Sequence, residues 1–236
     1  MEVIEVSAII PVYNDRNALE HAIPASVESL SRIAVGFEVI IAEDGSRDGT
    51  AAYAERMVEQ DRRIRLLHSD ERLGRGRALN RAISGARGDI VCYFDVDLAT
   101  DMRHLGELVA CIRNGYDIAT GSRLLSESRT ARSGVREFSS RGYNMLVRAV
   151  LGSTIHDHQC GFKAFNRERI LKLLPQVEAA HWFWDTEILI RAQRLGYRIA
   201  ELPVEWRESR GTTVKLRDIW EMGSAVFGLW WRLHGY

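Results

Sequence analysis

Residues 90–97 read IVCYFDVD, an apolar run that ends in two acidic residues. A short, continuous apolar run is typical of a strand buried on both faces, as in a parallel sheet. Asp95 and Asp97 lie directly at its end, so both carboxylates are predicted to emerge where the strand stops. Carboxylates so arranged can share one divalent cation, whose other ligands are waters and substrate phosphates. The alternative is a loop start with two solvated acids, because a lone Asp-x-Asp is common.

On both sides of this strand, apolar runs alternate with helical patterns. Strands are predicted at 5–12, 37–42, 64–68, 117–121 and 199–204, with a short strand ending near 165. Helices are predicted at 17–33, 48–59, 75–86, 102–114, 143–151, 168–174, 186–195 and 217–234, and polar loops at 124–141 and 206–214. Asn14 or Asp15 is expected to cap the start of the helix at 17–33, and Gly88 the end of the helix that precedes it. This order predicts an α/β fold with a Rossmann-like, mainly parallel central sheet and helices on both faces.

Polar clusters follow four of these strands. They are Tyr13–Asp15, Glu43–Ser46, Asp95–Asp97 and Gly121–Arg123. Ligands of open α/β sheets bind beyond the carboxyl ends of the strands, so the clusters predict a site at one sheet edge. The acids at 43–50 could accept hydrogen bonds from a ribose or a base, or could form a turn and a helix cap. Both interpretations can hold together.

Two further segments are candidates for phosphate binding. The glycine-rich stretch Leu73–Asn80 opens a helix and could cradle a phosphate, but it fits neither a P-loop nor the dinucleotide fingerprint. Arginines cluster in and beside the loop at 124–141, and a guanidinium suits bidentate phosphate binding. They are Arg123, Arg129, Arg132, Arg136 and Arg141. The alternative is a solvated basic loop.

Composition narrows the functional class. The 236 residues include 32 basic and 32 acidic ones, and this zero net charge argues against general nucleic-acid binding. Cys92, Cys111 and Cys160 have no paired spacing, so they indicate neither a disulfide framework nor a zinc site. No signal-peptide pattern is present, and the longest apolar candidate, 222–231, is shorter than the ~18–20 residues that span a bilayer. We therefore expect a soluble or membrane-peripheral protein.

The C-terminal segment 215–236 is predicted to form an amphipathic, aromatic-rich helix. It carries Trp220, Phe227, Trp230 and Trp231, with Lys215, Arg217 and Arg232 near its ends. Such a helix suits a membrane interface, and the alternative is packing on the protein body or on a second subunit.

Two further motifs contain acidic residues or histidines. We expect His156–His158 to form local structure rather than a metal site, with Asp157 orienting an arginine or its loop. Asp185 and Glu187 could act as a base or hold the arginine-rich loop at 124–141. Asp185 could instead cap a helix start.

The order of several motifs resembles family 2 glycosyltransferases with a GT-A fold. These are 11–15 (PVYND), 43–50 (EDGSRDGT), 73–76 (LGRG) and 95–97 (DVD). Later segments are similar to the dolichyl-phosphate mannose synthase branch, which includes polyprenyl-phosphate glucosyl- and mannosyltransferases. These are 121–123 (GSR), 136–142 (REFSSRG), 157–163 (DHQCGFK), 183–187 (FWDTE) and 202–206 (LPVEW). The resemblance covers nearly the whole chain, and implies a GT-A domain at 1–214 followed by the helix at 215–236.

The resemblance also implies site residues. The nucleotide sugar would be bound by Pro11, Tyr13, Asp15, Asp44, Gly45, Asp95, Arg207 and Lys215. Asp95 and Asp97 would hold Mg²⁺ or Mn²⁺. The acceptor phosphate would be bound by Arg123, Arg136, Ser140 and Arg141, and the catalytic set would be Asp97, Arg123, Arg136 and Ser140.

One position departs from the mannose synthase pattern, and it bears on the donor sugar. Mannose synthases typically read Asp-x-Asp-Leu-Gln, whereas Ala99 stands here in place of the glutamine and has no ligand atom. Glucosyltransferases of the branch often carry Ala-Thr nearby, as Ala99-Thr100 does. This difference weakens the assignment of mannose and leaves glucose or another sugar open, so the expected donors are GDP-mannose, UDP-glucose or another nucleotide sugar.

The function implied is inverting transfer of one sugar, mannose or glucose, to a dolichyl or polyprenyl phosphate. The enzyme would be cytoplasmic and peripheral to the membrane, with a membrane protein or a second copy as a possible partner. The lipid phosphate is already anionic and needs cationic residues more than a general base. The alternatives are a family 2 enzyme acting on a glycan or protein hydroxyl, and a nucleotide-sugar-binding protein without turnover.

Overall fold

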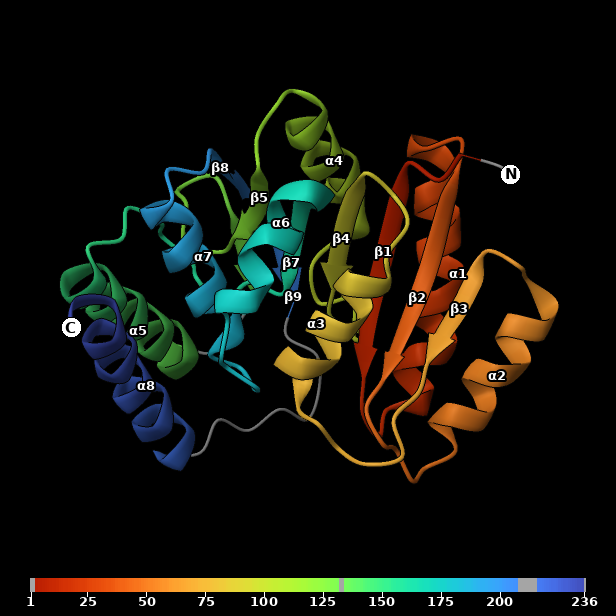
Figure 1. The fold of residues 1–236 in the computed structure, drawn as a ribbon, viewed down its shortest axis with the longest axis horizontal. Coiled ribbons are helices and arrows are strands. Elements are labelled where there is room, and N and C mark those ends of the chain that lie inside the picture. The colour runs from red at the N-terminus through yellow and green to blue at the C-terminus, as the bar shows by residue number, and fades with distance from the viewer. Residues whose placement is uncertain (1–2, 132–133, 208–215, 236) are drawn as a thin grey trace.

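A computed structural model of the protein describes residues 3–131, 134–207 and 216–235, with only the backbone at 135, 136 and 216–220. Its centre is a seven-stranded sheet in the order β3-β2-β1-β4-β7-β5-β8 (Figure 1). The strands are β1 (Val6–Val12), β2 (Phe37–Glu43), β3 (Ile64–Leu67), β4 (Ile90–Phe94), β5 (Ile118–Ser122), β7 (Phe162–Asn166) and β8 (Ile199–Pro203). Only β7 runs antiparallel to its neighbours among these seven. The prediction of a mainly parallel sheet is confirmed.

Helices cover both faces of this sheet (Figure 1). One face packs against α1 (Arg16–Ile33), α2 (Thr50–Gln60) and α4 (Leu105–Arg113), and the other against α3 (Arg75–Gly85), α6 (Arg167–Leu173) and α7 (Trp184–Arg194). The helices pack there because their apolar residues recur at helical spacing, as Leu19, Ala22 and Ile23 do in α1. Short 3₁₀ turns, η1 (Met102–His104) and η2 (Leu174–Gln176), precede α4 and follow α6.

Two long helices, α5 (Gly134–Leu151) and α8 (Leu216–His234), lie side by side at one end of the molecule (Figure 1). Their buried residues form a separate apolar cluster with α7, made of Val147, Leu151, Phe183, Ile190, Val226 and Leu229. A two-stranded sheet joins β6 (Arg129–Ala131) to β9 (Glu205–Arg207). Within the described ranges, no helix is both long and apolar enough to cross a membrane.

The prediction of a loop at 124–141 is wrong in part, because the segment contains β6 and the first turns of α5. Among the described side chains of those turns none is fully buried, and Phe138 is 81% exposed. The turns are supported by an ion pair between Glu137 and Arg141, one turn apart. They therefore carry no apolar periodicity from which a helix could be predicted. Likewise, β9 occupies the start of the loop predicted at 206–214, whose remainder lies outside the described residues.

The role predicted for Gly88 is also wrong. Helix α3 ends at Gly85, and the capping residue is Ala86 in an extended conformation. Gly88 instead allows close contact with β1, since a Cβ there would lie 2.7 Å from the backbone nitrogen of Ser7. Its own N–H donates to the Ser7 hydroxyl.

Candidate active site

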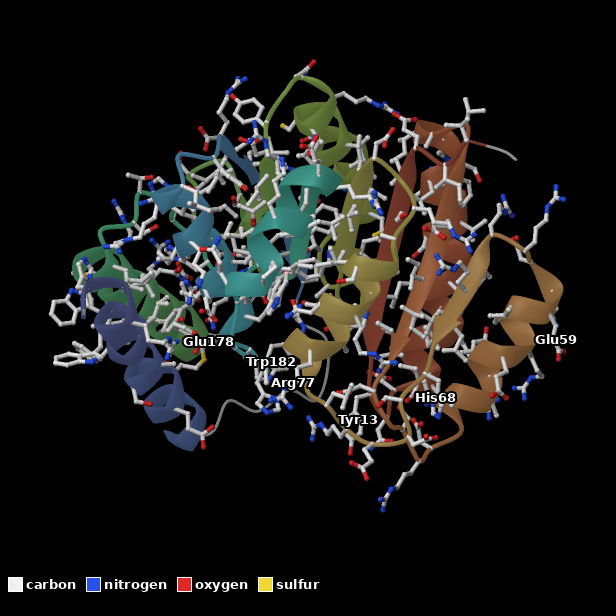
Figure 2. The ribbon with its side chains drawn as sticks, viewed as in Figure 1. Tyr13, Glu59, His68, Arg77, Glu178 and Trp182 are labelled. Atoms are coloured by element: carbon white, nitrogen blue, oxygen red, sulfur yellow. The ribbon has the colours of Figure 1, made fainter. Side chains whose placement is uncertain are left out.

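The four polar clusters predicted from the sequence do lie at one edge of the sheet. Strands β1, β2 and β4 are parallel neighbours, and β5 has the same direction because antiparallel β7 separates it from β4. Figure 2 shows Tyr13, Arg77 and Trp182 along this edge, whereas Glu59 lies on the far side of α2. The edge therefore gathers residues from both halves of the chain.

Asp44 shapes the loop that leads into α3. Its buried carboxylate accepts the backbone N–H groups of Leu73, at 2.7 Å, and Gly74, at 2.9 Å. The next residue, Gly45, has a φ of +79°, and a Cβ there would lie 2.7 Å from the carbonyl carbon of Glu71. Only glycine meets both conditions without strain. These two residues thus hold the loop after β2 against the loop before α3.

The first cluster combines a helix cap with an exposed aromatic ring. Asp15 accepts the N–H of Ala18 at 3.2 Å and caps α1, as one of the two candidate capping residues was expected to do. Pro11 is buried in β1. Tyr13 is 37% exposed, with the guanidinium of Arg72 4.0 Å from its ring centroid. Tyr13 and Arg72 therefore present a flat, cationic surface at the sheet edge.

Asp95 and Asp97 emerge together after β4. A Cβ on Gly161 would overlap the Asp95 carboxylate, so the glycine leaves room for this side chain. The Gly161 carbonyl also accepts the Asp95 N–H at 3.1 Å. Asp97 is exposed, and one of its oxygens accepts the N–H of Ala99 at 3.1 Å.

The donor set at this position fits Mg²⁺ or Mn²⁺ that is held mainly by its substrate. In the described part of the chain, no group of three or more acidic, histidine or cysteine side chains is placed to hold a metal. Two carboxylates with accessible oxygens do match a hard cation that completes its shell with phosphate oxygens and waters.

A buried ion network starts at Asp95. Arg75 donates to Asp95 at 2.6 Å and, through its other terminal nitrogen, to Asp185 at 2.5 Å. The second oxygen of Asp185 accepts from Lys163 at 2.9 Å and from the Tyr93 hydroxyl. Burial raises the pKa of Asp185 to about 6, against the opposing effect of Arg75, and burial lowers the pKa of Lys163 to about 8. Both members of the Asp185–Lys163 pair are thus ionised at neutral pH.

Sequence reasoning assigned no role to three members of this network, Arg75, Tyr93 and Lys163. Arg75 belongs to the glycine-rich LGRG motif, and Lys163 lies between Phe162 and Ala164 in β7. The available signal was a lysine within a short strand between apolar residues. Such a position is buried, as Lys163 is here, and a buried charge requires a partner of opposite charge. Its partner Asp185 was expected to act as a base, to hold the arginine-rich loop at 124–141 or to cap a helix. The Asp185 carboxylate is occupied by Arg75, Lys163 and Tyr93.

Arg123, which follows β5, is fixed by Asp157. Its Nε and one Nη donate to the two carboxylate oxygens at 2.7 and 2.9 Å, and its backbone N–H donates at 2.9 Å. Although burial opposes ionisation, Arg123 holds the pKa of Asp157 well below its usual range. The expectation that Asp157 orients an arginine is confirmed. Asp95 is also near enough to contribute to raising the pKa of Arg123, against the effect of burial.

His158 connects this loop to α5. Its Nδ1 lies 2.7 Å from the side-chain oxygen of Asn144, and its Nε2 lies 2.8 Å from the Ser153 hydroxyl. Asn144 in turn donates to the carbonyl of Ser140. The Ser140 hydroxyl is buried and has no hydrogen-bond partner among the described residues. Burial lowers the pKa of His158 to about 3, so the ring is neutral.

Of the remaining predicted site residues, two have described side chains and two do not. Arg141 is exposed and pairs with Glu137 at 2.9 Å. Arg207 is exposed at the end of β9. Arg136 belongs to α5, but its side chain is outside the described part, and Lys215 lies outside the described residues altogether.

Glu187 has a local structural role. One oxygen accepts the N–H groups of Glu178 and Ala179, at 3.1 and 2.8 Å, and the other pairs with Arg191 at 2.8 Å. The carboxylate therefore holds the segment that precedes α7.

Comparisons with known proteins agree with this architecture. Residues 7–174 match the model of glycosyl transferase family 2. The glycosyltransferase AglD of Haloferax volcanii is 53% identical over 98% of this chain and 38% of its own length. The dolichyl-phosphate beta-glucosyltransferase of Dictyostelium discoideum is 31% identical over 89% of this chain and 68% of its own length. The chain thus spans well under half of the first relative and about two thirds of the second.

Solved structures show the same fold. Glucosyl-3-phosphoglycerate synthase from Mycobacterium tuberculosis, in complex with Mn²⁺, uridine diphosphate and phosphoglyceric acid, superimposes with a TM-score of 0.69. The identity is 21%, over 98% of this chain and 79% of the synthase. Sheet, helices and acidic edge together match the GT-A fold. The chain belongs to glycosyl transferase family 2.

Proposed function

We propose that this chain transfers glucose from UDP-glucose to a polyprenyl phosphate, with inversion and with Mg²⁺ or Mn²⁺. The observation that carries the proposal is the juxtaposition of an accessible carboxylate pair after β4 with the anchored guanidinium of Arg123 after β5. Several relatives are dolichyl-phosphate beta-glucosyltransferases by name, which supports both the sugar and the acceptor. Ala99 in place of the mannose synthase glutamine supports glucose over mannose.

On the donor side, Asp95 and Asp97 would hold the metal. A bound divalent cation neutralises the charge that develops on the leaving diphosphate. Asp44 and Gly45 shape the loop beside the nucleotide, and Tyr13 offers a ring at the same edge. Arg207 and Lys215 remain proposals for the diphosphate. The mycobacterial synthase was solved in complex with Mn²⁺ and uridine diphosphate, which supports a metal-dependent UDP-sugar donor.

On the acceptor side, Arg123 would receive the lipid phosphate, with Ser140, Arg136 and Arg141 as the further proposed contacts. Asp157 keeps the guanidinium in one orientation, which lowers the entropy cost of binding. The phosphate is ionised near pH 7, so an in-line attack needs positioning rather than deprotonation. Such an attack inverts the anomeric centre.

The contacts of the candidate bases favour a phosphate acceptor over a hydroxyl acceptor. A hydroxyl would require a general base within hydrogen-bond reach. Asp185 is buried in contact with Arg75, Lys163 and Tyr93. Both oxygens of Glu187 are likewise engaged.

We further propose that the enzyme acts at the cytoplasmic surface of a membrane. Helices α5 and α8 expose large apolar side chains, with Phe138 81%, Phe227 56% and Trp231 69% exposed. Exposed aromatic residues on an amphipathic helix suit a lipid–water interface. This would bring the site to an acceptor that is itself held in the bilayer.

A donor screen tests the proposed reaction. Purified protein is incubated with radiolabelled UDP-glucose, GDP-mannose or UDP-GlcNAc, with a short polyprenyl phosphate or the matching polyprenol, and Mn²⁺ or EDTA. We expect label in the lipid only with UDP-glucose, the phosphate and the metal.

Asp97→Asn should lower the rate about 100-fold or more, because the leaving group loses its charge stabilisation.

Glu59→Gln, which changes an exposed acid on α2 far from the site (Figure 2), is the matched control and should retain the wild-type rate. Equal transfer to polyprenol would reject the phosphate acceptor. A preference for GDP-mannose would reject glucose while leaving the rest of the proposal standing.

A further inference from the structure

We propose that Arg75 is an internal counter-cation for Asp95, which keeps the metal from binding before the nucleotide and so sets the order of donor assembly. The inference rests on the metal site proposed above. It assigns Arg75 a positioning role, because the guanidinium acts through the Asp95 carboxylate.

The geometry of Arg75 is that of a bridge between two carboxylates. One terminal nitrogen lies 2.6 Å from Asp95 and the other 2.5 Å from Asp185. The guanidinium also lies over two aromatic rings, 5.3 Å from the centroid of Tyr93 and 5.1 Å from that of Trp182. The side chain is only 12% exposed. Two ion pairs and two rings thus keep the positive charge beside Asp95.

The charges of the buried cluster are balanced without a metal. Asp95 and Asp185 are matched by Arg75 and Lys163, which pairs with Asp185 at 2.9 Å. A divalent cation arriving alone at Asp95 would face the guanidinium of Arg75 at close range, where poor hydration makes like charges costly. A nucleoside diphosphate arriving with the cation supplies the missing negative charge. The metal should therefore bind well only together with the nucleotide.

Asp185 makes release of Asp95 possible. When the metal takes Asp95, Arg75 keeps its bond to Asp185 and is not left as an unpaired buried charge. Conversely, the hold of Arg75 on Asp95 is weakened by this competing partner. The arrangement therefore predicts opposite effects on metal binding for removal of Arg75 and removal of the Asp185 charge.

Metal binding without nucleotide provides the test. Mn²⁺ is titrated into the full chain, and free Mn²⁺ is followed by its electron paramagnetic resonance signal. We expect Arg75→Met to bind Mn²⁺ about tenfold more tightly than the wild type, because the repelling charge is gone. Asp185→Asn should bind it more weakly than the wild type, since Arg75 then has Asp95 as its one remaining carboxylate partner in this network. Arg62→Met, which removes an exposed arginine from the turn before β3 at the opposite edge of the sheet, is the control and should match the wild type.

The outcomes separate the inference from the proposed function. If Arg75→Met binds nucleotide-free Mn²⁺ no better than the wild type, or if both variants shift in the same direction, the inference is overturned. If the wild type binds no Mn²⁺ even with saturating UDP, the proposed metal site itself fails. Should circular dichroism show that Arg75→Met is unfolded, Arg75→Gln replaces it. Its neutral amide removes the repelling charge but can still donate a hydrogen bond to one carboxylate, so a gain in Mn²⁺ affinity is again expected, and no gain would reject the inference.

Discussion

Arg123 shows how a neighbouring acid can prepare a residue for binding. A guanidinium on a loop would sample many orientations, but two hydrogen bonds from its Nε and Nη to the buried Asp157 leave it one, and the backbone N–H of Arg123 adds a third. The ion pair is buried, so its loss would leave Asp157 as an unpaired charge in the interior. Asp157 therefore serves both the stability of the loop and the position of the proposed phosphate ligand.

The neutral, buried His158 makes stability depend on pH. Its folded-state pKa of about 3 lies below the value of about 6.5 expected in the unfolded chain. Its stabilising contribution is therefore complete above pH 6.5 and is lost as the pH falls from there towards 3, because only the unfolded chain takes up the proton. The slope from this residue is at most about 1.4 kcal/mol per pH unit. Urea unfolding at pH 7 and pH 5 measures it.

His158→Gln should be less stable than the wild type at pH 7 but should lose less further stability at pH 5. The exposed His21 on α1 gives the control, since His21→Gln should keep the wild-type pH dependence. An unchanged pH dependence in His158→Gln would show that other groups cause the acid sensitivity.

For individual residues, the sequence predicted those whose hydrogen-bond partners lie only a few positions away. Asn14 or Asp15 was expected as a helix cap from its position before an apolar-periodic segment, and Asp15 is the cap. The partnership of Arg75 with Asp95 and Asp185 could not be predicted, because it joins three elements distant in sequence. Such contacts depend on strand order and helix placement, which residue type alone does not specify.

The same limit appears among the secondary-structure elements. β4 was predicted with its observed bounds because an apolar run ends abruptly at an acid. The first turns of α5 and the short strands β6 and β9 were missed because they bury few apolar side chains. Elements stabilised by charge pairs or by a single neighbouring strand leave little periodicity in the sequence.

Helix α8 has two faces with different expected roles, and single substitutions can separate them. Leu229 is fully buried between α5 and α7, so Leu229→Ala should cost about 2 kcal/mol or more in the free energy of unfolding. Trp231 is 69% exposed, and Trp231→Ala should change that free energy by less than about 0.5 kcal/mol. Urea unfolding measures both effects.

If the exposed face meets lipid, Trp231→Ala should also reduce co-sedimentation with vesicles of phosphatidylcholine and phosphatidylglycerol severalfold. An exposed residue on the opposite side of the molecule, Glu59, again gives a control in Glu59→Gln. Unchanged co-sedimentation of the double variant Phe227→Ala, Trp231→Ala would argue that this face binds another surface.

For the whole molecule, alternation of strands and helices was enough to predict a mainly parallel sheet with a site at its carboxyl edge. The position of β7 was not predictable in this way. It enters from a distant part of the chain, runs antiparallel between β4 and β5, and places Lys163 opposite Tyr93. The buried ion network therefore depends on strand pairing between distant parts of the chain. The acidic edge follows from residues that lie next to the strands in the sequence.

The zero net charge of the chain conceals this separation of acids and arginines, and ligand-linked stability makes it measurable. If the edge binds a metal–nucleotide complex, UDP with Mn²⁺ at about 100 times its dissociation constant should stabilise the fold by about 2.7 kcal/mol. For a chain of this size, that corresponds to a rise of about 5–10 °C in the melting temperature. Asp97→Asn should lose the part of the rise that requires Mn²⁺ and keep the smaller shift given by UDP with EDTA. Because Asp97 is exposed, its substitution should leave the melting temperature of the ligand-free protein nearly unchanged, so a difference confined to the liganded state would locate the metal at this carboxylate. An equal rise in both proteins would place the nucleotide–metal complex elsewhere.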